Sequence, residues 1–364
     1  MVELIRDGDV ARYADFDNRA LGRAPQRAAL ENVPLIDMSP FVVAGSAEAR
    51  QQTARAIRAA SIDIGFFYLT GHGLEPSELD EMLAAAHRFF ALPLTKKMKV
   101  DARLSPDRQG FIRTGGIEPE SNPDRATDIK ERFFMSRELL PGEPARGRFK
   151  SGQSQWPAPD AVPGLEPRMK AYIVHLLGLT TALGRAFALS LDLPENYFEP
   201  HYRFPGAVLA LNYYPPLDPA TLKSTQWSFS PHTDYGAFTI LLQDGLGGLQ
   251  VRNALGAWID VPPRPGTFVV NLGDLFQRWT NDLYVSTLHR AANFRDRARV
   301  SAAFFISPHG STIIRCLPTC QSHDNPPRYE PVESEEYNRA LVEQSNRTGR
   351  PGVARETADR LKPA

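Results

Sequence analysis

Apolar residues follow two different patterns along this chain, and the pattern changes near residue 200. Before that point, helical spacing of Ala, Ile, Leu and Met predicts three helices. After it, short apolar runs separated by Gly, Pro and Asp predict β-strands, as in an antiparallel sandwich or barrel. The predicted helices span residues 46–63, about 75–91 and 166–191. The predicted strands span residues 33–37, 65–70, 207–214, 237–243, 248–252, 257–261, 267–272, 285–292 and 299–307.

These patterns suggest four segments. They are an N-terminal arm (1–32), a helical and strand region that packs on the core (33–200), a β-rich core (201–310) and a charged C-terminal tail (311–364) with a helix around 333–346. The boundary near 200 need not separate independent domains, because the long helix is expected to pack on the outside of the sheet. Residues 101–165 are rich in Gly, Pro and Arg, which predicts a long functional or mobile loop.

Composition narrows the class of protein. The 364 residues include 42 basic and 42 acidic side chains, and this balance argues against nucleic acid or a charged membrane surface as a partner. No run of 18 apolar residues predicts a membrane-spanning helix, and the first residues lack the apolar stretch of a signal peptide. Two cysteines make no disulfide framework, which favours a cytoplasmic protein. The oligomeric state is left open.

Two of the eight histidines stand out as candidate metal ligands. His232 and Asp234 are two apart on an extended segment, so their side chains point to the same side. His289 follows in another predicted strand. Two histidines and one carboxylate bind one face of an octahedral metal and leave three positions open, as in non-haem Fe(II) oxygenases. Two alternatives stay open. The triplet of His232, Thr233 and Asp234 can arise by chance, and His289 can be a hydrogen-bonded histidine of the core.

A candidate anion site follows in the sequence. Arg299 and Ser301 alternate to one side of a strand that is otherwise apolar. A buried arginine needs an anionic partner, and its fork with a neighbouring hydroxyl suits a carboxylate. An internal Asp or Glu would serve equally well. Tyr214 ends an earlier strand, where its hydroxyl could support the same ligand or simply pack.

The order of these motifs resembles the isopenicillin N synthase-like family of 2-oxoglutarate- and Fe(II)-dependent dioxygenases. The motifs are Asn212-Tyr213-Tyr214-Pro215, His232-Thr233-Asp234, His289 and Arg299-Val300-Ser301. Segments 33–37, 65–73 and 244–251 also resemble signatures of that family, so the likeness covers roughly residues 33–310.

The resemblance implies a mainly β fold with flanking helices, built on a distorted double-stranded β-helix (jelly roll). It also implies that His232, Asp234 and His289 bind Fe(II). Arg299, Ser301 and Tyr214 would hold the distal carboxylate of 2-oxoglutarate. The expected enzyme uses O2 to oxidise a small molecule by hydroxylation, desaturation, ring closure or demethylation, with release of succinate and CO2.

The substrate pocket and three rival functions stay open. Residues 110–113, residues 130–134 and Phe304 are expected to line the pocket. One rival is an Fe(II) oxidase without 2-oxoglutarate, of the isopenicillin N synthase or aminocyclopropane oxidase type, since those enzymes carry the same Arg and Ser pair. A second is a non-catalytic metal-binding protein, although no ligand is missing. A third is a zinc hydrolase, in which the pair of Arg299 and Ser301 would have no evident role.

Overall fold

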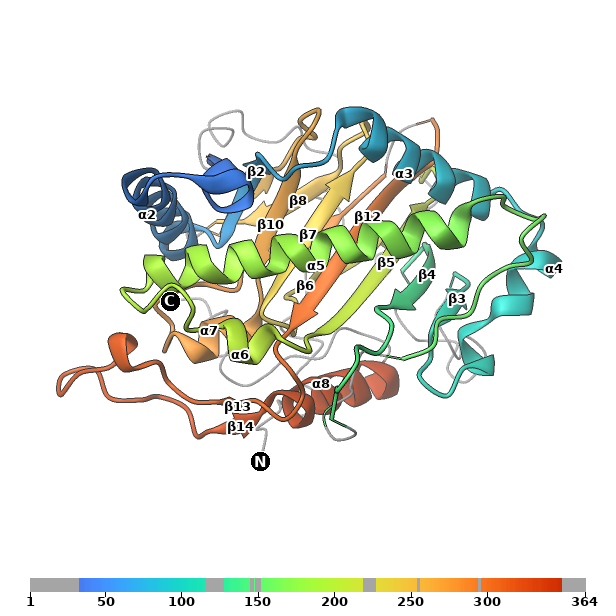
Figure 1. The fold of residues 1–364 in the computed structure, drawn as a ribbon. Helices are drawn as coiled ribbons and strands as arrows, with labels where there is room; N and C mark the ends of the chain where they lie inside the picture. Colours follow the sequence, from blue (N-terminus) through green and yellow to red (C-terminus); the bar gives the residue numbers. More distant parts are fainter. Residues whose placement is uncertain are drawn as a thin grey trace.

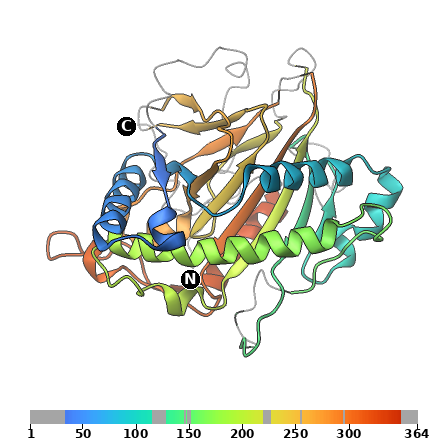
Figure 2. The same ribbon diagram turned by 45° about the horizontal axis from the view of Figure 1, so that its top comes forward.

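A computed structural model describes most of the chain in one body of two facing sheets with helices on one side (Figures 1 and 2). It describes residues 33–114, 128–144, 147, 152–218, 227–253, 256–293 and 296–348. The expected N-terminal arm and the end of the expected tail lie outside these residues.

An eight-stranded sheet, the major sheet, forms most of the molecule. Its strand order is β1-β2-β10-β7-β12-β5-β4-β3, and all neighbours are antiparallel except the parallel pair β1 and β2. Its strands are β1 (Leu35–Asp37), β2 (Phe66–Thr70), β3 (Gly110–Ile112), β4 (Glu131–Ser136), β5 (Gly206–Tyr214), β7 (Phe238–Gln243), β10 (Phe268–Leu272) and β12 (Arg299–Ser307).

A four-stranded sheet, the minor sheet, faces part of the major sheet. Its order is β6-β11-β8-β9, with all neighbours antiparallel. Its strands are β6 (Phe229–His232), β8 (Leu249–Arg252), β9 (Trp258–Asp260) and β11 (His289–Ala291). A separate pair, β13 (Ile313–Ile314) and β14 (Val332–Glu333), precedes the last helix. Two facing antiparallel sheets with this strand order form the expected jelly roll.

Helices cover the outer face of the major sheet (Figure 1). The α-helices are α2 (Ala47–Asp63), α3 (Pro76–Phe90), α4 (Leu94–Lys97), α5 (Leu165–Ser190), α6 (Glu199–Tyr202), α7 (Asp274–Trp279) and α8 (Ser334–Thr348). α2 begins after Ser46, whose hydroxyl accepts the backbone N–H of Ala49. α3 begins with Pro76 after a reciprocal pair of caps between Glu75 and Glu78. The three long helices agree with the sequence prediction.

Side-chain alternation gives the major sheet two different faces. On the outer face, Phe133, Leu211 and Ala302 pack into the core beneath the helices. On the inner face, β2 and β10 contribute apolar side chains that pack against the minor sheet, such as Phe66 and Val269. Towards β12, β5 and β4, the inner face becomes polar. A polar interior of this kind is where a binding site is expected.

Three sequence predictions need correction. Residues 101–165 are not one long loop, because β3 and β4 lie within them and extend the major sheet. The strand predicted at 285–292 is limited to His289–Ala291. Phe304 does not line the inner face, because it is fully buried in the core under the helices. Its position follows from strand alternation, since Ser301 points inward and Phe304 lies three residues later.

Among the residues that the structure describes, one helix is long and apolar enough to cross a membrane by composition alone. It is α5, and 61% of the window that passes this test is buried inside the protein. The helix lies along the major sheet in both views (Figures 1 and 2). A mostly buried helix of this kind is typical of a core helix that packs on a sheet, so it is weak evidence for a membrane span.

Candidate functional site

The three candidate metal ligands meet between the two sheets. His232 ends β6 and His289 begins β11, and the two residues are directly paired across the minor sheet. Asp234 follows β6, and its Oδ1 lies 3.8 Å from Nε2 of each histidine. One donor atom from each residue lies within 4.8 Å of the others, and all three side chains are buried. The arrangement can bind one metal ion from one side.

Backbone carbonyls orient both imidazole rings. Nδ1 of His232 lies 2.8 Å from the carbonyl oxygen of Ser230, and Nδ1 of His289 lies 3.0 Å from that of Thr287. A carbonyl oxygen can only accept, so Nδ1 carries the proton in each ring and Nε2 keeps its lone pair. Metal-binding histidines are usually held in this way. The ring of Phe229 also stacks on His232, at 3.9 Å between centroids.

Two buried side chains orient the carboxylate of Asp234. Oδ2 accepts hydrogen bonds from Thr239 on β7 and from Asn271 on β10. Oδ1 is thereby left to face the two histidines. The major sheet thus positions the acidic ligand, while the minor sheet supplies both imidazoles.

Burial and charge keep His232 and Asp234 in their metal-binding protonation states. Burial, together with nearby His289, lowers the pKa of His232 to about 3, so this imidazole is neutral at pH 7. Burial alone would raise the pKa of Asp234. The two histidines and the hydrogen bonds from Asn271 and Thr239 outweigh it and lower that pKa. A neutral imidazole and an ionised carboxylate are the forms that bind a divalent metal.

The predicted carboxylate site is also assembled. Arg299 pairs directly with Tyr214 across β12 and β5, and Ser301 pairs with Asn212. The guanidinium of Arg299 lies 4.8 Å from the centre of the Tyr214 ring. The Asn212 amide donates to the Ser301 hydroxyl at 3.5 Å. All four side chains are at most 2% exposed, so the structure brings the predicted residues together in the interior.

Arg299 has hydrogen-bonding capacity that the described residues do not use. Its Nη2 donates to Gln243 at 3.1 Å, whereas buried Nε and Nη1 have no partner among the described residues. A buried charge in this state requires an anion. The free edge of the guanidinium, beside the hydroxyls of Ser301 and Tyr214, therefore fits a carboxylate of a bound molecule.

One strand connects the anion site to the metal site. Thr239 and Gln243 both point to the inner face of β7, where Thr239 bonds to Asp234 and Gln243 bonds to Arg299. Residues four apart on a strand are separated by about 13 Å between Cα atoms. The side chains of Asp234 and Arg299 extend into this interval. A small molecule with a carboxylate at one end and metal-binding oxygens at the other fits between them.

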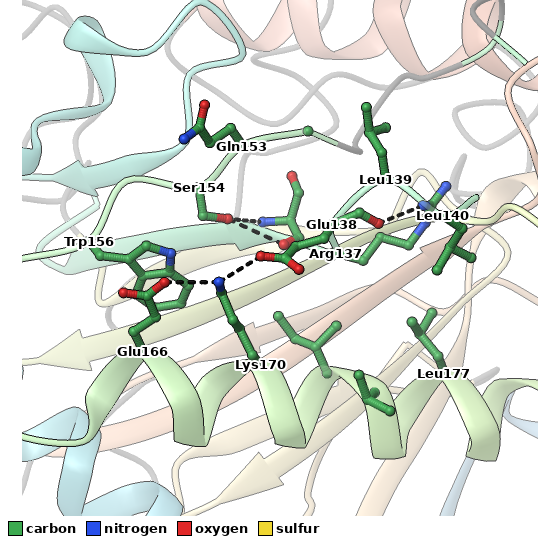
Figure 3. A pocket seen from close by; sticks show the side chains of 14 residues that line it. Arg137, Glu138, Leu139, Leu140, Gln153, Ser154, Trp156, Glu166, Lys170 and Leu177 are labelled. Carbon is green, nitrogen blue, oxygen red and sulfur yellow. Dashed lines mark hydrogen bonds and ion pairs between the residues drawn. The ribbon is translucent and has the colours of Figure 1, made fainter. Parts of the chain in front are cut away.

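A separate cavity of about 490 Å³ lies away from the triad (Figure 3). It opens between α5 and the chain that leaves β4, and its polar lining includes Glu166, Lys170 and Glu138. Lys170 forms ion pairs with both glutamates, at 2.6 Å to Glu138 and 2.9 Å to Glu166. The other cation of its lining, Arg137, is paired with Glu143. With both cations paired and none of the candidate metal ligands in its lining, this cavity does not compete with the triad as a catalytic site.

Sequence analysis missed the residues that support the metal ligands. Asn271 and Thr239 hold Asp234, and Gln243 holds Arg299. A usable signal was present, because Asn271 is the one polar residue of β10, and Thr239 and Gln243 are the two polar residues of the otherwise apolar β7. A buried amide or hydroxyl in such a strand needs a polar partner, and the candidate site supplies one. The predicted pocket segments do reach the inner face, through Ile112 and Arg132.

Comparison with known proteins agrees, over most of the chain, with the family resemblance seen in the sequence. A family model described as the 2OG-Fe(II) oxygenase superfamily matches residues 205–308. A second model, described as the N-terminal region of non-haem dioxygenases in morphine synthesis, matches residues 33–159. Together the two models span both the site and the elements that precede it.

Individual relatives are similar over nearly their whole length. A 2-oxoglutarate-Fe(II) type oxidoreductase of Metarhizium majus is 38% identical over 331 residues, covering 86% of this chain and 88% of the relative. One of Emericella nidulans is 36% identical over 320 residues, with 86% and 90% covered. The crystal structure of a full-length Neurospora crassa protein in complex with α-ketoglutarate has a TM-score of 0.74 at 30% identity, covering 85% of this chain and 96% of that one.

Proposed function

Because the chain belongs to the 2OG-Fe(II) oxygenase superfamily, we propose that its buried triad is the iron site and its buried arginine is the 2-oxoglutarate anchor. The protein is a 2-oxoglutarate-dependent non-haem iron oxygenase that uses Fe(II) and O2. In the proposed assignment, His232, Asp234 and His289 hold the iron. Arg299, Ser301 and Tyr214 hold the distal carboxylate of 2-oxoglutarate.

The observation that carries this assignment is the unused capacity of Arg299. Its Nε and Nη1 are buried and lack partners within the described residues. The inner face of β7 runs from this arginine to the residues that hold Asp234. A metal-binding protein without a cosubstrate has no need of a buried cation here. 2-Oxoglutarate, with two carboxylates and a ketone, matches both ends of this site.

The chain's own residues bind and orient the reacting molecules. Fe(II), 2-oxoglutarate and O2 together supply the oxidant, while 2-oxoglutarate leaves as succinate and CO2. His232 and His289 present Nε2 lone pairs in fixed rings, and Asp234 presents one oxygen because its other oxygen is occupied. Burial of the site between the two sheets excludes water and strengthens each of these electrostatic contacts.

Succinate release tests the proposed function. Purified enzyme with Fe(II), ascorbate and 2-oxoglutarate should release succinate in air, and a chelator or Zn²⁺ in place of Fe(II) should abolish the release. A screen of small molecules should then show product formed in step with succinate. Product formation without any 2-oxoglutarate requirement would contradict the proposal and favour an Fe(II) oxidase of the isopenicillin N synthase type.

Removing a residue that orients Asp234 should weaken iron binding. Thr239→Val deletes a hydroxyl that donates to the carboxylate and keeps the shape of the side chain. The loss of such an outer partner typically lowers metal affinity by about 10–100-fold. We expect that increase in the Fe(II) dissociation constant, measured by anaerobic titration. Thr180→Val is the matched control, because its buried hydroxyl bonds to Leu176 within α5. Equal Fe(II) affinity in the two variants would remove Thr239 from the metal site.

The proposed substrate is a small molecule, and the proposed location is the cytoplasm. A site built from buried side chains suits a small ligand better than a macromolecule. Cys316 and Cys320 are both free thiols, which agrees with a reducing compartment.

A further inference from the structure

A second arginine faces the interior near the proposed 2-oxoglutarate anchor. Asn212 on β5 lies opposite Ser301 of β12 on one side and opposite Arg132 of β4 on the other. Directly opposed residues of antiparallel strands point to the same face, so Arg132 shares the inner face with Ser301. Two strand spacings separate the Cα atoms of Arg132 and Ser301 by about 10 Å. Arg132 therefore lies beside the cosubstrate site and outside it.

Within the described part of the chain, the guanidinium of Arg132 has no ion-pair partner. It lies 5.1 Å from the centre of the Phe134 ring, and the groups whose charges reach it are Asp128, Tyr214 and Tyr235. Burial lowers the pKa of Arg132, but a guanidinium stays protonated in proteins. A permanent positive charge thus faces the interior.

The carboxylate of Asp128, whose charge acts on Arg132, already accepts hydrogen bonds from other donors. Asp128 accepts a hydrogen bond from Lys130 Nζ at 2.8 Å and another from the backbone N–H of Ser230, also at 2.8 Å. Burial lowers the pKa of Lys130, whereas Asp128 and the ring face of Phe229 favour the ammonium form. Asp128 and Lys130 therefore form an ion pair at 2.8 Å, and among the described residues no ion pair joins Asp128 to Arg132.

The other charges of the proposed site cancel. With iron and 2-oxoglutarate bound, Fe(II) and Arg299 would be balanced by Asp234 and the two carboxylates of 2-oxoglutarate, and both histidines would bind the metal as neutral imidazoles. The charge of half-buried Arg132 then has no counter-charge within the proposed site. A guanidinium on the inner face can bind an anion, and the ligand that matches its fork is a carboxylate.

We propose that Arg132 binds a carboxylate of the substrate, so that the enzyme oxidises small organic acids. The proposal rests on the proposed function, because the charge balance assumes that iron and 2-oxoglutarate are bound. Arg132 would select substrates by charge, two strands away from the residues that hold the cosubstrate. Its role is in specificity, and the metal ligands do not depend on it.

A panel of matched acids and amides tests this proposal. Small aryl- and alkyl-acetic acids are added to the anaerobic Fe(II)–2-oxoglutarate enzyme, alongside the primary amide of each acid. An amide keeps the shape and hydrogen bonding of the acid without its charge. The first measurement is any change in the visible charge-transfer band of iron-bound 2-oxoglutarate, and the second is succinate release in air. One or more acids should perturb the band and stimulate succinate release. The concentration needed should be about tenfold or more below the concentration at which the matching amide has the same effect.

Variants assign the effect to Arg132. Arg132→Gln should raise the half-saturating concentration of that acid by about 10–150-fold, the range for a lost hydrogen bond to a charged group. Its response to the amide, its band without substrate and its KM for 2-oxoglutarate should stay unchanged. Arg132→Lys should recover part of the affinity. Arg203→Gln is the matched control, because Arg203 lies 5.2 Å over Phe204 in a similar stack but is exposed beyond the far end of β5.

Several outcomes would overturn the proposal. In the panel, these are amides that act as strongly as the acids, or no acid that acts at all. In Arg132→Gln, they are acid binding equal to that of the wild type, or a raised KM for 2-oxoglutarate with an unchanged response to the acid. Failure of the proposed function is distinguishable, because the band would then be absent before any acid is added.

Discussion

Replacing His289 with alanine is expected to abolish 2-oxoglutarate turnover and stoichiometric Fe(II) binding while leaving the fold intact. His289 is one of only two imidazoles in the triad, and its Nε2 lies 3.8 Å from Asp234. Without it, two ligands remain, too few to hold the metal and keep three positions for chemistry. The loss should exceed the roughly 10–100-fold effect of removing an outer partner. His232→Ala and Asp234→Ala should behave in the same way.

A matched control separates this effect from general damage to the core. His72 is a similarly buried histidine that bonds to the Gly266 carbonyl at 3.1 Å, away from the triad. His72→Ala should keep stoichiometric Fe(II) binding in an anaerobic titration. Circular dichroism should show that both variants are folded. If folded His289→Ala binds one Fe(II) and releases succinate normally, the third ligand is assigned wrongly.

Arg299→Lys should raise the KM for 2-oxoglutarate by about 10–150-fold, although the positive charge survives. A lysine is a point charge and cannot donate the forked pair of hydrogen bonds that a guanidinium gives to a carboxylate. The expected loss is about 1.5–3 kcal/mol, the usual range for hydrogen bonds to charged groups. The atoms concerned in Arg299 are Nε and Nη1, which have no partner among the described residues.

Arg137→Lys is the control for the arginine prediction. Arg137 is as buried as Arg299, at 1% exposure, but it pairs with Glu143 through two hydrogen bonds. Its replacement should lower the free energy of unfolding and leave the KM for 2-oxoglutarate unchanged. An unchanged KM in Arg299→Lys would move the anchoring role to another basic residue.

The sequence predicted the parts of the fold that follow regular apolar patterns. The long helices and β5, β7, β10 and β12 agree with prediction because each buries a continuous apolar face. β3 and β4 were missed because they are short strands in a segment rich in Gly, Pro and Arg. β4 places Phe133 in the core and charged Arg132 on the inner face, so its composition resembles a loop.

The site was predicted less evenly than the fold. The six residues proposed for iron and 2-oxoglutarate could be predicted from the sequence because their motifs fix both residue type and order. In the structure these six residues lie in the interior between the two sheets. The residues that support them were missed, since contacts such as that of Asn271 with Asp234 join strands far apart in sequence. Phe304 was wrongly assigned to the pocket although strand alternation from Ser301 points it outward.

The most direct test of the central claim is a spectrum that needs no substrate. Under anaerobic conditions, Fe(II) and 2-oxoglutarate together should give a weak visible charge-transfer band, because the keto-acid binds iron through two oxygens. Neither component alone should give it, and Arg299→Ala should weaken it at fixed 2-oxoglutarate. Wild-type enzyme with iron bound but no band at saturating 2-oxoglutarate would contradict the assignment of this site to iron and 2-oxoglutarate.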